Sequence, residues 1–278
     1  MAEIQHFITT HEATLRLGVF VGILGLMALV ELILPKRRLV APKGLRWALN
    51  LGLVVVNALV LRLLFPVLAA GLALEAARRG WGLFNRLDWP PALEFVIAVV
   101  ALDFIIYVQH RLFHVVPLFW RIHRMHHVDR DIDVTTGLRF HPFEIVLSMV
   151  IKLGAVVALG PTAAAVILFE IILNGMAMFN HGNIRLPQRL DAVLRALVVT
   201  PDMHRVHHSV RAAEYNRNFG FNLSLWDRLF ASYRARPADG HKAMTIGQTD
   251  YQGRAAESFP GLLWLPFRRL PPLPASGG

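Results

Sequence analysis

Five long apolar stretches constrain the fold of this chain more than any other feature. They cover residues 15–34, 45 to about 74, 92–108, 143–159 and 162–179. A helix needs about 20 apolar residues to cross a bilayer, and only helices and closed barrels satisfy their backbone groups there. Since only Gly160 and Pro161 separate the last two stretches, we expect a tight helical hairpin. The sequence predicts an all-α integral membrane helical bundle with about four to five membrane helices.

The composition agrees with a membrane protein. Mean hydropathy is +0.46, and only 17% of the 278 residues are charged, against about 25% in soluble domains. The net charge of +10 comes from basic residues that flank apolar stretches, which favours anionic lipid over nucleic acid as a partner. The absence of cysteine excludes disulfides, iron–sulfur clusters and a cysteine nucleophile. The first apolar stretch lacks the flanks of a cleaved signal, which predicts a retained membrane helix.

The basic residues also predict an orientation. Lys36, Arg37, Arg38, Lys43 and Arg46 crowd the loop after the first apolar stretch, so we place this loop in the cytoplasm. Following the chain from there, the third stretch and the hairpin both end on the same side. All histidine-rich segments should then form a helical cap on the cytoplasmic face.

Three histidine clusters dominate the polar part of the chain. They are His110/His114, His123/His126/His127 and His204/His207/His208. On a helix, positions i, i+3 and i+4 share one face, so each cluster can direct its imidazoles toward a common point. Imidazole is the commonest side-chain metal ligand, and eight exceed what one ion can use. The clusters predict two metal ions, with iron as the redox-active candidate.

Several further polar residues are candidates near such a site. His181, which follows the hairpin, is predicted to be a ligand, whereas His141 is favoured as a structural residue. Asp202 precedes His204 by two residues, which makes it a candidate, although a weaker one, to support a ligand. The arginines that follow the first histidine of each cluster are interpreted as a solvated or lipid-facing basic edge: Arg111, Arg124 and Arg205.

Asp103 and Glu170 are carboxylates within the apolar stretches, where charged groups are costly and usually paired or functional. Both share helical faces with histidines further along the chain. We expect them to accept imidazole N–H bonds, which orient metal ligands and raise their basicity. For Glu170, a helix–helix contact or a pairing with Lys152 or Arg62 is an equally good interpretation.

The order of motifs resembles the fatty acid hydroxylase/sterol desaturase superfamily over residues 92–235, about half of the chain. The motifs are HRLFH (110–114), HRMHH (123–127), RFHPFE (139–144), NHGN (180–183), HRVHH (204–208), NFG (218–220) and WDRLF (226–230). The resemblance implies a membrane di-iron oxygenase that uses dioxygen to hydroxylate or desaturate a lipid C–H bond. The lipid would be fatty acyl, alkylglycerol or sterol-like.

The resemblance also assigns roles to residues. The eight clustered histidines and His181 match the family's metal ligands, with no catalytic residue distinct from them. Asn183, Asp227 and His141 match positions with supporting roles. The expected organisation is membrane helices and loops in 1–91, a catalytic domain in 92–235 and a cytoplasmic or interfacial tail in 236–278.

One departure concerns the electron source, since no fused haem-binding HPGG motif is present. Electrons would come from a separate donor, such as a cytochrome b5-like protein, a ferredoxin or a pterin. The expected location is a bacterial inner membrane or an ER-like membrane.

Two alternative functions remain open from the sequence. A zinc-dependent membrane lipid hydrolase would need a general base beside the metal, for which Glu144 or Glu170 could serve, although no HExxH motif is present. A membrane metal transporter or sensor would need ionisable residues along a path across the bilayer, whereas here they gather at one end.

Overall fold

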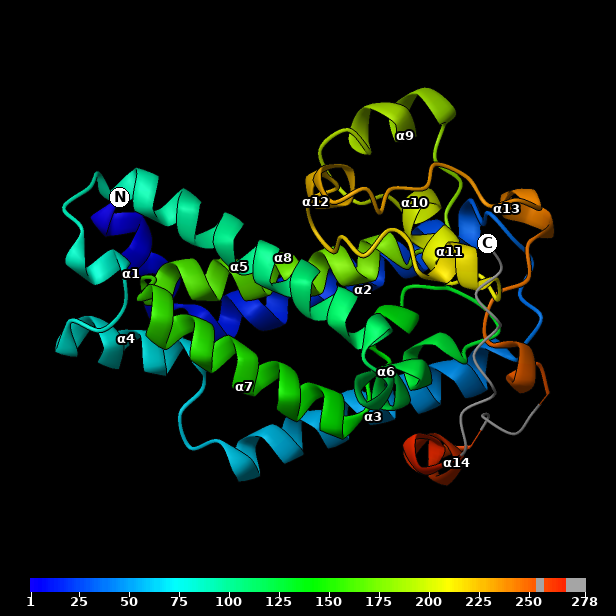
Figure 1. The fold of residues 1–278 in the computed structure, drawn as a ribbon, viewed down its shortest axis with the longest axis horizontal. Coiled ribbons are helices and arrows are strands. Elements are labelled where there is room, and N and C mark those ends of the chain that lie inside the picture. Colours follow the sequence, from blue (N-terminus) through cyan, green and yellow to red (C-terminus); the bar gives the residue numbers. More distant parts are fainter. Residues whose placement is uncertain (254–257, 269–278) are drawn as a thin grey trace.

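Long helices lie side by side in this chain, and shorter helices form a cap at one end of them (Figure 1). The computed structural model describes residues 1–253 and 258–268. Within these ranges no β-strand occurs, only isolated bridges, so the all-α prediction is confirmed. Five segments are long and apolar enough to cross a membrane. The long helices are α2 (Glu12–Ile33), α3 (Lys43–Leu64), α5 (Pro91–Val115), α7 (Pro142–Leu159) and α8 (Ala163–Asn180).

The predicted hairpin is confirmed as α7 and α8. Gly160 ends α7 in the left-handed region at φ 68°, and a Cβ there would collide with the carbonyl oxygen of Trp81. Pro161 follows, and the side chain of Thr162 accepts the N–H of Ala165 to cap α8. α8 is the central helix of the bundle, with α1 (Ala2–Thr10), α2, α4 (Ala69–Arg79) and α5 packed against it.

The apolar stretch from residue 45 to about 74 is not one continuous helix. α3 ends at Leu64, and α4 begins at Ala69. Pro66 lies between them, and proline lacks the N–H that a continuing helix needs. α4 packs its alanine-rich face against α7 and α8, at the end of the bundle opposite the cap (Figure 1).

The helix directions bring the histidine-bearing segments together. α2, α5 and α8 run toward the cap, whereas α3 and α7 run away from it (Figure 1). The basic loop after α2 lies at the cap end, since the N–H of Lys36 donates to the carbonyl of Asn183 at 3.0 Å. The histidine segments and this loop therefore share one end of the bundle, as the topology predicted.

Short helices joined by well-packed loops build the cap. α14 (Phe259–Leu263) and the 3₁₀ turn η5 (Leu265–Phe267) pack their apolar residues near α3 and α6 (Pro117–His127). Of the predicted tail 236–278, residues 254–257 and 269–278 lie outside the described residues. The remaining elements are η1 (Phe84–Arg86), η2 (Thr136–Leu138), α9 (Gln188–Leu194), α10 (Pro201–His207), α11 (Ala212–Tyr215), α12 (Leu225–Leu229), α13 (Gly240–Ala243) and η3 (Thr249–Tyr251).

Candidate metal centre

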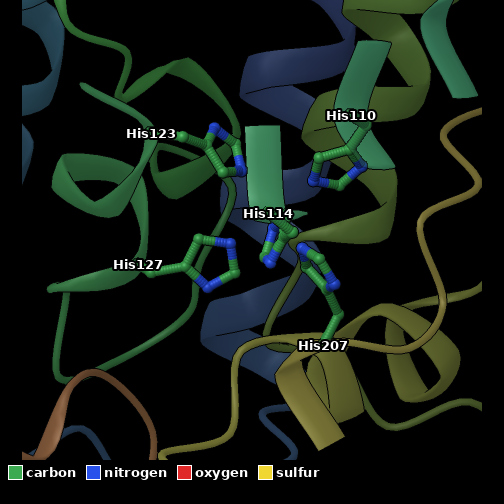
Figure 2. A group of neighbouring side chains, drawn as sticks. All are labelled: His110, His114, His123, His127 and His207. Atoms are coloured by element: carbon green, nitrogen blue, oxygen red, sulfur yellow. The ribbon is translucent and has the colours of Figure 1, made fainter. Parts of the chain in front are cut away.

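All nine histidines predicted as ligands gather in the cap, in two neighbouring groups. Within each group, one nitrogen from every ring lies within 4.8 Å of the others. Figure 2 shows the first group, whose rings come from α5, α6 and α10. The first group is His110, His114, His123, His127 and His207, and the second is His126, His181, His204 and His208.

Each HxxHH motif divides its histidines between the two groups, so the expectation that each cluster points to one common centre is wrong. In the second cluster, His123 and His127 belong to the first group, while His126 belongs to the second. The third cluster divides in the opposite sense, since His204 and His208 share the second group and His207 joins the first. The ends of each motif lie one above the other on the helix, and the histidine at i+3 lies to one side. Each motif thus contributes to both groups.

Five of the nine rings are fixed by a hydrogen bond from Nδ1 to an oxygen acceptor. With that nitrogen protonated, Nε2 carries the lone pair and is the ligand atom. The acceptors are the carbonyls of Phe219 for His110 (2.7 Å), Arg217 for His207 (2.8 Å), Ala177 for His181 (2.7 Å) and Arg139 for His126 (3.1 Å), and the carboxylate of Glu144 for His123 (2.7 Å).

The Nε2 atoms of the second group face one another. His181 Nε2 lies 3.0 Å from His126 Nε2 and 3.0 Å from His204 Nε2, and His204 Nε2 lies 3.3 Å from His208 Nε2. Since His126 and His181 donate from Nδ1, their facing nitrogens carry lone pairs, which repel unless a cation lies between them. Nitrogens about 2.0–2.1 Å from one metal ion are themselves about 3 Å apart. This spacing fits a shared metal ion.

Burial keeps the rings neutral and able to bind a metal. Removal from water lowers the pKa of His207 and of His181 to about 3. Burial, followed by repulsion from neighbouring rings, also lowers the pKa of His126, His127 and His204 well below the usual value. In the first group, Nε2 of His110, His123 and His207 is buried without a hydrogen-bond partner. Each group thus presents unprotonated nitrogens to a centre of its own.

The short segment 217–219, which follows α11, orients two histidine rings from different clusters, His110 and His207. Asn218 has φ 55°, a conformation that asparagine tolerates better than most residues. Its side chain donates to the carbonyls of Met203 and Arg234, both at 2.8 Å. The flanking carbonyls, those of Arg217 and Phe219, accept from His207 and His110 as described above. Asn218 was not predicted as a site residue, although it begins the NFG motif.

Asp227 supports the histidine rings indirectly, through the backbone. Its carboxylate accepts the N–H groups of Phe219 and Gly220, both at 2.8 Å, and burial raises its pKa. Among the described residues it forms no hydrogen bond with a histidine, but it fixes the backbone whose carbonyl orients His110. Its predicted supporting role is compatible with this arrangement.

Glu144 is the carboxylate that orients an imidazole. It lies in the first turn of α7, and it is buried with His123. The sequence interpretation considered it only as a base for the hydrolase alternative. The RFHPFE motif was the available signal, but spacing alone does not show that the first turn of the hairpin faces α6.

Replacing Glu144 with glutamine should weaken metal binding by roughly 10–100-fold, because the neutral amide no longer polarises the His123 ring. Iron retained against increasing chelator measures this change. Asp103→Asn is the matched control and should leave retention unchanged. Equal retention in wild type and Glu144→Gln would show that this contact does not tune the site.

The predicted imidazole contacts of Asp103 and Glu170 are wrong. Asp103 accepts the indole N–H of Trp226 at 2.8 Å and the backbone N–H of Leu223 at 3.2 Å. Glu170 bridges three helices through Arg16 and Lys152, each at 2.5 Å. The pairing with Lys152 confirms the alternative interpretation of Glu170.

Three other residues were predicted to support the site, namely Asn183, Asp202 and His141. In the described part of the chain, none of them forms a hydrogen bond with the nine histidine rings. Asn183 exchanges hydrogen bonds with the backbone of Arg37 at 3.0 and 2.8 Å, and Asp202 pairs with Lys36 at 2.6 Å and with Arg205. His141 caps α7 by accepting the N–H of Phe143. This agrees with its interpretation as a structural residue.

The interpretation of the cluster arginines is correct only for Arg111, which is exposed. Arg124 and Arg205 are buried, with 1% and 0% exposure. Arg205 pairs with Asp202, and Arg124 donates to the backbone carbonyls of Leu265 and Arg268. These arginines hold α6 and α10 in the cap.

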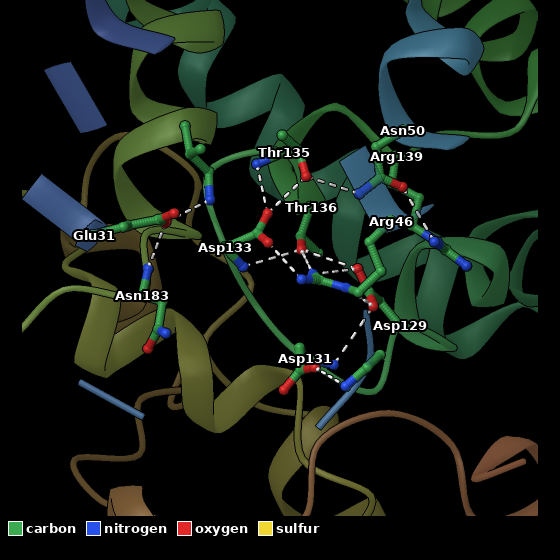
Figure 3. Close-up of polar contacts among 12 residues, drawn as sticks. Glu31, Arg46, Asn50, Asp129, Asp131, Asp133, Thr135, Thr136, Arg139 and Asn183 are labelled. Carbon is green, nitrogen blue, oxygen red and sulfur yellow. Dashed lines mark hydrogen bonds and ion pairs between the residues drawn. The ribbon is translucent and has the colours of Figure 1, made fainter. Parts of the chain in front are cut away.

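A buried polar network, which the sequence did not predict, connects α3 to the loop after α6 (Figure 3). Arg46 binds both oxygens of Asp129 at 2.7 and 2.8 Å, and it also contacts Asp133. Burial alone would raise the pKa of Asp129, but Arg46 and Arg139 lower it to about 2. Asn50 accepts from Arg139 at 3.1 Å, and the carbonyl of Arg139 in turn orients His126.

Further carboxylates of the network bind backbone N–H groups. Asp131 accepts from Val40 and Ala41. Glu31, at the end of α2, accepts from Val134 at 2.7 Å and from Asn183 at 2.8 Å (Figure 3). The first two long helices carry no recognised motif, yet they fix the loop between α6 and α7.

The comparisons with known proteins agree with the geometry. The ornithine lipid hydroxylase OlsE of Rhizobium tropici is 31% identical over 66% of this chain and 53% of its own length. The alkylglycerol monooxygenase of Homo sapiens is 27% identical over 55% of this chain and 33% of its own, and that of Xenopus tropicalis is 25% identical over 69% and 42%. The matches span about half or less of these relatives. No solved structure matches the chain significantly.

The family model described as fatty acid hydroxylase matches residues 95–232. This range contains the nine histidines of the two groups, Glu144, Asn218 and Asp227. Residues 95–232 of this chain belong to the fatty acid hydroxylase family.

Proposed function

We propose that this protein is a membrane-bound di-iron oxygenase that hydroxylates a C–H bond of a long-chain lipid with dioxygen. The observation that carries the proposal is the convergence of nine imidazoles, eight of them from buried residues, into two adjacent groups. Imidazole suits iron, and two neighbouring ions fit the division of both HxxHH motifs. The relatives, by their names a lipid hydroxylase and alkylglycerol monooxygenases, support a lipid as the substrate.

In this proposal, bound iron supplies the activation of dioxygen that an unactivated C–H bond requires. The chain's own residues hold and orient that chemistry. Five rings are fixed by the carboxylate of Glu144 and by the carbonyls of Ala177, Arg139, Arg217 and Phe219. The apolar helices would bind the hydrocarbon chain of the lipid, and burial of the histidines limits the access of water. Two external electrons would come from a separate donor. The histidine end would face the cytoplasm.

The structure disfavours the hydrolase alternative through the positions of its candidate bases. Glu144 is engaged with His123, and Glu170 is engaged with Arg16 and Lys152. Glu170 also precedes His181 by eleven residues, about 16 Å along α8. Glu144 is therefore used to orient a histidine through Oε1, and Glu170 lies too far from the histidines to activate a water molecule there.

The test uses the full chain, purified in detergent and also expressed in cells whose lipids are profiled. We expect about two irons per chain and a lipid product heavier by one oxygen atom, which derives from labelled dioxygen. His207→Ala is the inactive control. Zinc after iron supplementation, together with lipid cleavage products, would support the hydrolase instead.

A further inference from the structure

Two short cap helices expose apolar side chains, although they belong to the more polar half of the chain. On α9 and the turn after it, Leu190, Val193 and Leu197 are 46%, 68% and 71% exposed. On α12, Leu225 and Leu229 are 45% and 62% exposed. Spacings of three and four residues place each set on one helix face. A contiguous exposed apolar surface marks an interaction site.

The two helices form one unit, which we call the foot (residues 188–198 and 223–230). The N–H of Ser224 donates to the carbonyl of Leu197 at 3.1 Å, and the side chain of Arg228 donates to the carbonyl of Arg195 at 2.8 Å. An isolated antiparallel bridge pairs Val198 with Leu223. The exposed side chains thus belong to one connected surface.

Asp103 fixes the foot to the middle of α5. It accepts from Leu223 and from the Trp226 indole, and it lies twelve residues from each end of Pro91–Val115. That is about 18 Å from either end of a helix about 37 Å long. Since the hydrocarbon core is about 30 Å thick, a bilayer spanned by α5 must reach the foot. In Figure 1, α9 and α12 lie alongside the second half of α5 and not beyond its end.

The apolar surface continues from α5 onto the foot. A groove of about 330 Å³ runs between them and is lined almost entirely by apolar side chains, including Val96, Val100, Phe104, Trp226 and Phe230. Val96 and Phe230 are 59% and 44% exposed. A lipid chain can therefore contact the membrane-spanning helix and the foot at once.

The charges of the foot also suit a phospholipid surface. Its two acidic residues, Asp191 and Asp227, are buried, and Asp191 pairs with Arg195. Arg189 and Arg228 are exposed, and arginine can extend from an apolar surface to lipid phosphates. The foot thus presents apolar and positively charged groups, but no exposed carboxylate.

We propose that the foot is a monotopic membrane anchor, which inserts α9 and α12 into the leaflet at the histidine end of the bundle. Its occupant is the phospholipid of that leaflet: acyl chains cover the leucines, valine and phenylalanine, and phosphates meet Arg189 and Arg228. The proposal does not depend on the bound metal or on the lipid that is oxidised.

The absence of cysteine from the chain allows a direct test by single nitroxide labels in phospholipid nanodiscs. Labels would be placed in Val193→Cys, Leu197→Cys and Leu229→Cys, with Val96→Cys as the membrane reference. Lys242→Cys is the matched cap control, because Lys242 is exposed on α13, outside the foot. Relaxation enhancement by oxygen and by a water-soluble nickel chelate reports the depth of each label.

We expect the three foot labels to resemble the Val96 reference, with oxygen access several-fold higher, relative to nickel access, than at residue 242. Thermal unfolding of each labelled variant checks that the fold is kept. Foot labels as accessible to nickel as residue 242 would overturn the proposal. Low access to both reagents would also overturn it, because that pattern indicates cover by protein, such as a second copy of the chain.

Discussion

Replacing His207 with alanine should reduce the metal content from about two ions per chain to about one and abolish product formation. The remaining ion should be held by the second group, to which His207 does not belong. His126→Ala should produce the mirror result, because it removes a ligand from the second group and leaves the first group intact. Activity should be lost in both variants, since the proposed reaction needs both ions. Metal analysis of purified protein, together with lipid product analysis, measures the two effects.

His141→Ala is the matched control for these substitutions. His141 is also buried, but it caps α7 and belongs to neither group. Its loss should cost about 0.5–2 kcal/mol of stability, as for other helix caps, and leave the metal content at its wild-type value. Full metal content and turnover in both His207→Ala and His126→Ala would contradict the proposed ligand groups.

The gathering of the histidines could be predicted because it follows from local geometry. Ligand motifs on one helix face need only a common end of the bundle to meet, and charge and hydropathy indicated that end. The division of His126 from His123 and His127 could not be predicted in the same way. It depends on where His181 and α10 lie relative to α6, which is a property of tertiary packing.

The errors concern side chains whose partners are distant in sequence. Asp103 lies on the helix stripe that includes His110, but seven residues correspond to about 10 Å along the axis, too far for a hydrogen bond. Its true partner, Trp226, is in another segment. Arg205 pairs with Asp202 three residues earlier, but its burial depends on the fold of the cap, where Lys36 from a distant segment also binds Asp202. In each case the partner of the charged side chain could not be identified from the sequence.

The polar network around Arg46 shows most clearly which contacts could not be predicted from the sequence. Its residues come from α3 and the loop after α6, and Arg46 was interpreted only as one of the charges that set the membrane orientation. Within a sequence, an arginine beside the membrane and an Asp-x-Asp-x-Asp run look like solvated charges. The structure buries Arg46 and Asp133 at 2% and 0% exposure.

Arg46→Met should therefore be among the most destabilising single substitutions in the cap. Methionine has a similar length, but it removes the cation that contacts both Asp129 and Asp133, and Arg139 remains the only named cation acting on Asp129. Removing one partner of a buried ion pair costs about 3–5 kcal/mol, which should lower the melting temperature by roughly 10 °C. Arg78→Met is the matched control: Arg78 pairs with Glu75 on the exposed face of α4, where a salt bridge contributes about 0–1 kcal/mol.

Arg46→Met should also weaken metal binding in the second histidine group more than in the first. Arg46 holds Asp129 and Asp133 in the loop that carries Arg139, whose carbonyl orients His126 of the second group. Arg46→Met should then lose metal from the second group first, whereas Arg46→Lys, which keeps the charge but not the paired contacts to Asp129, should be intermediate in stability. Adding Asp129→Asn and Asp133→Asn to Arg46→Met should recover part of the stability, because the uncompensated charges are removed. If the triple variant is no more stable than Arg46→Met, the cost arises from packing and not from buried charge.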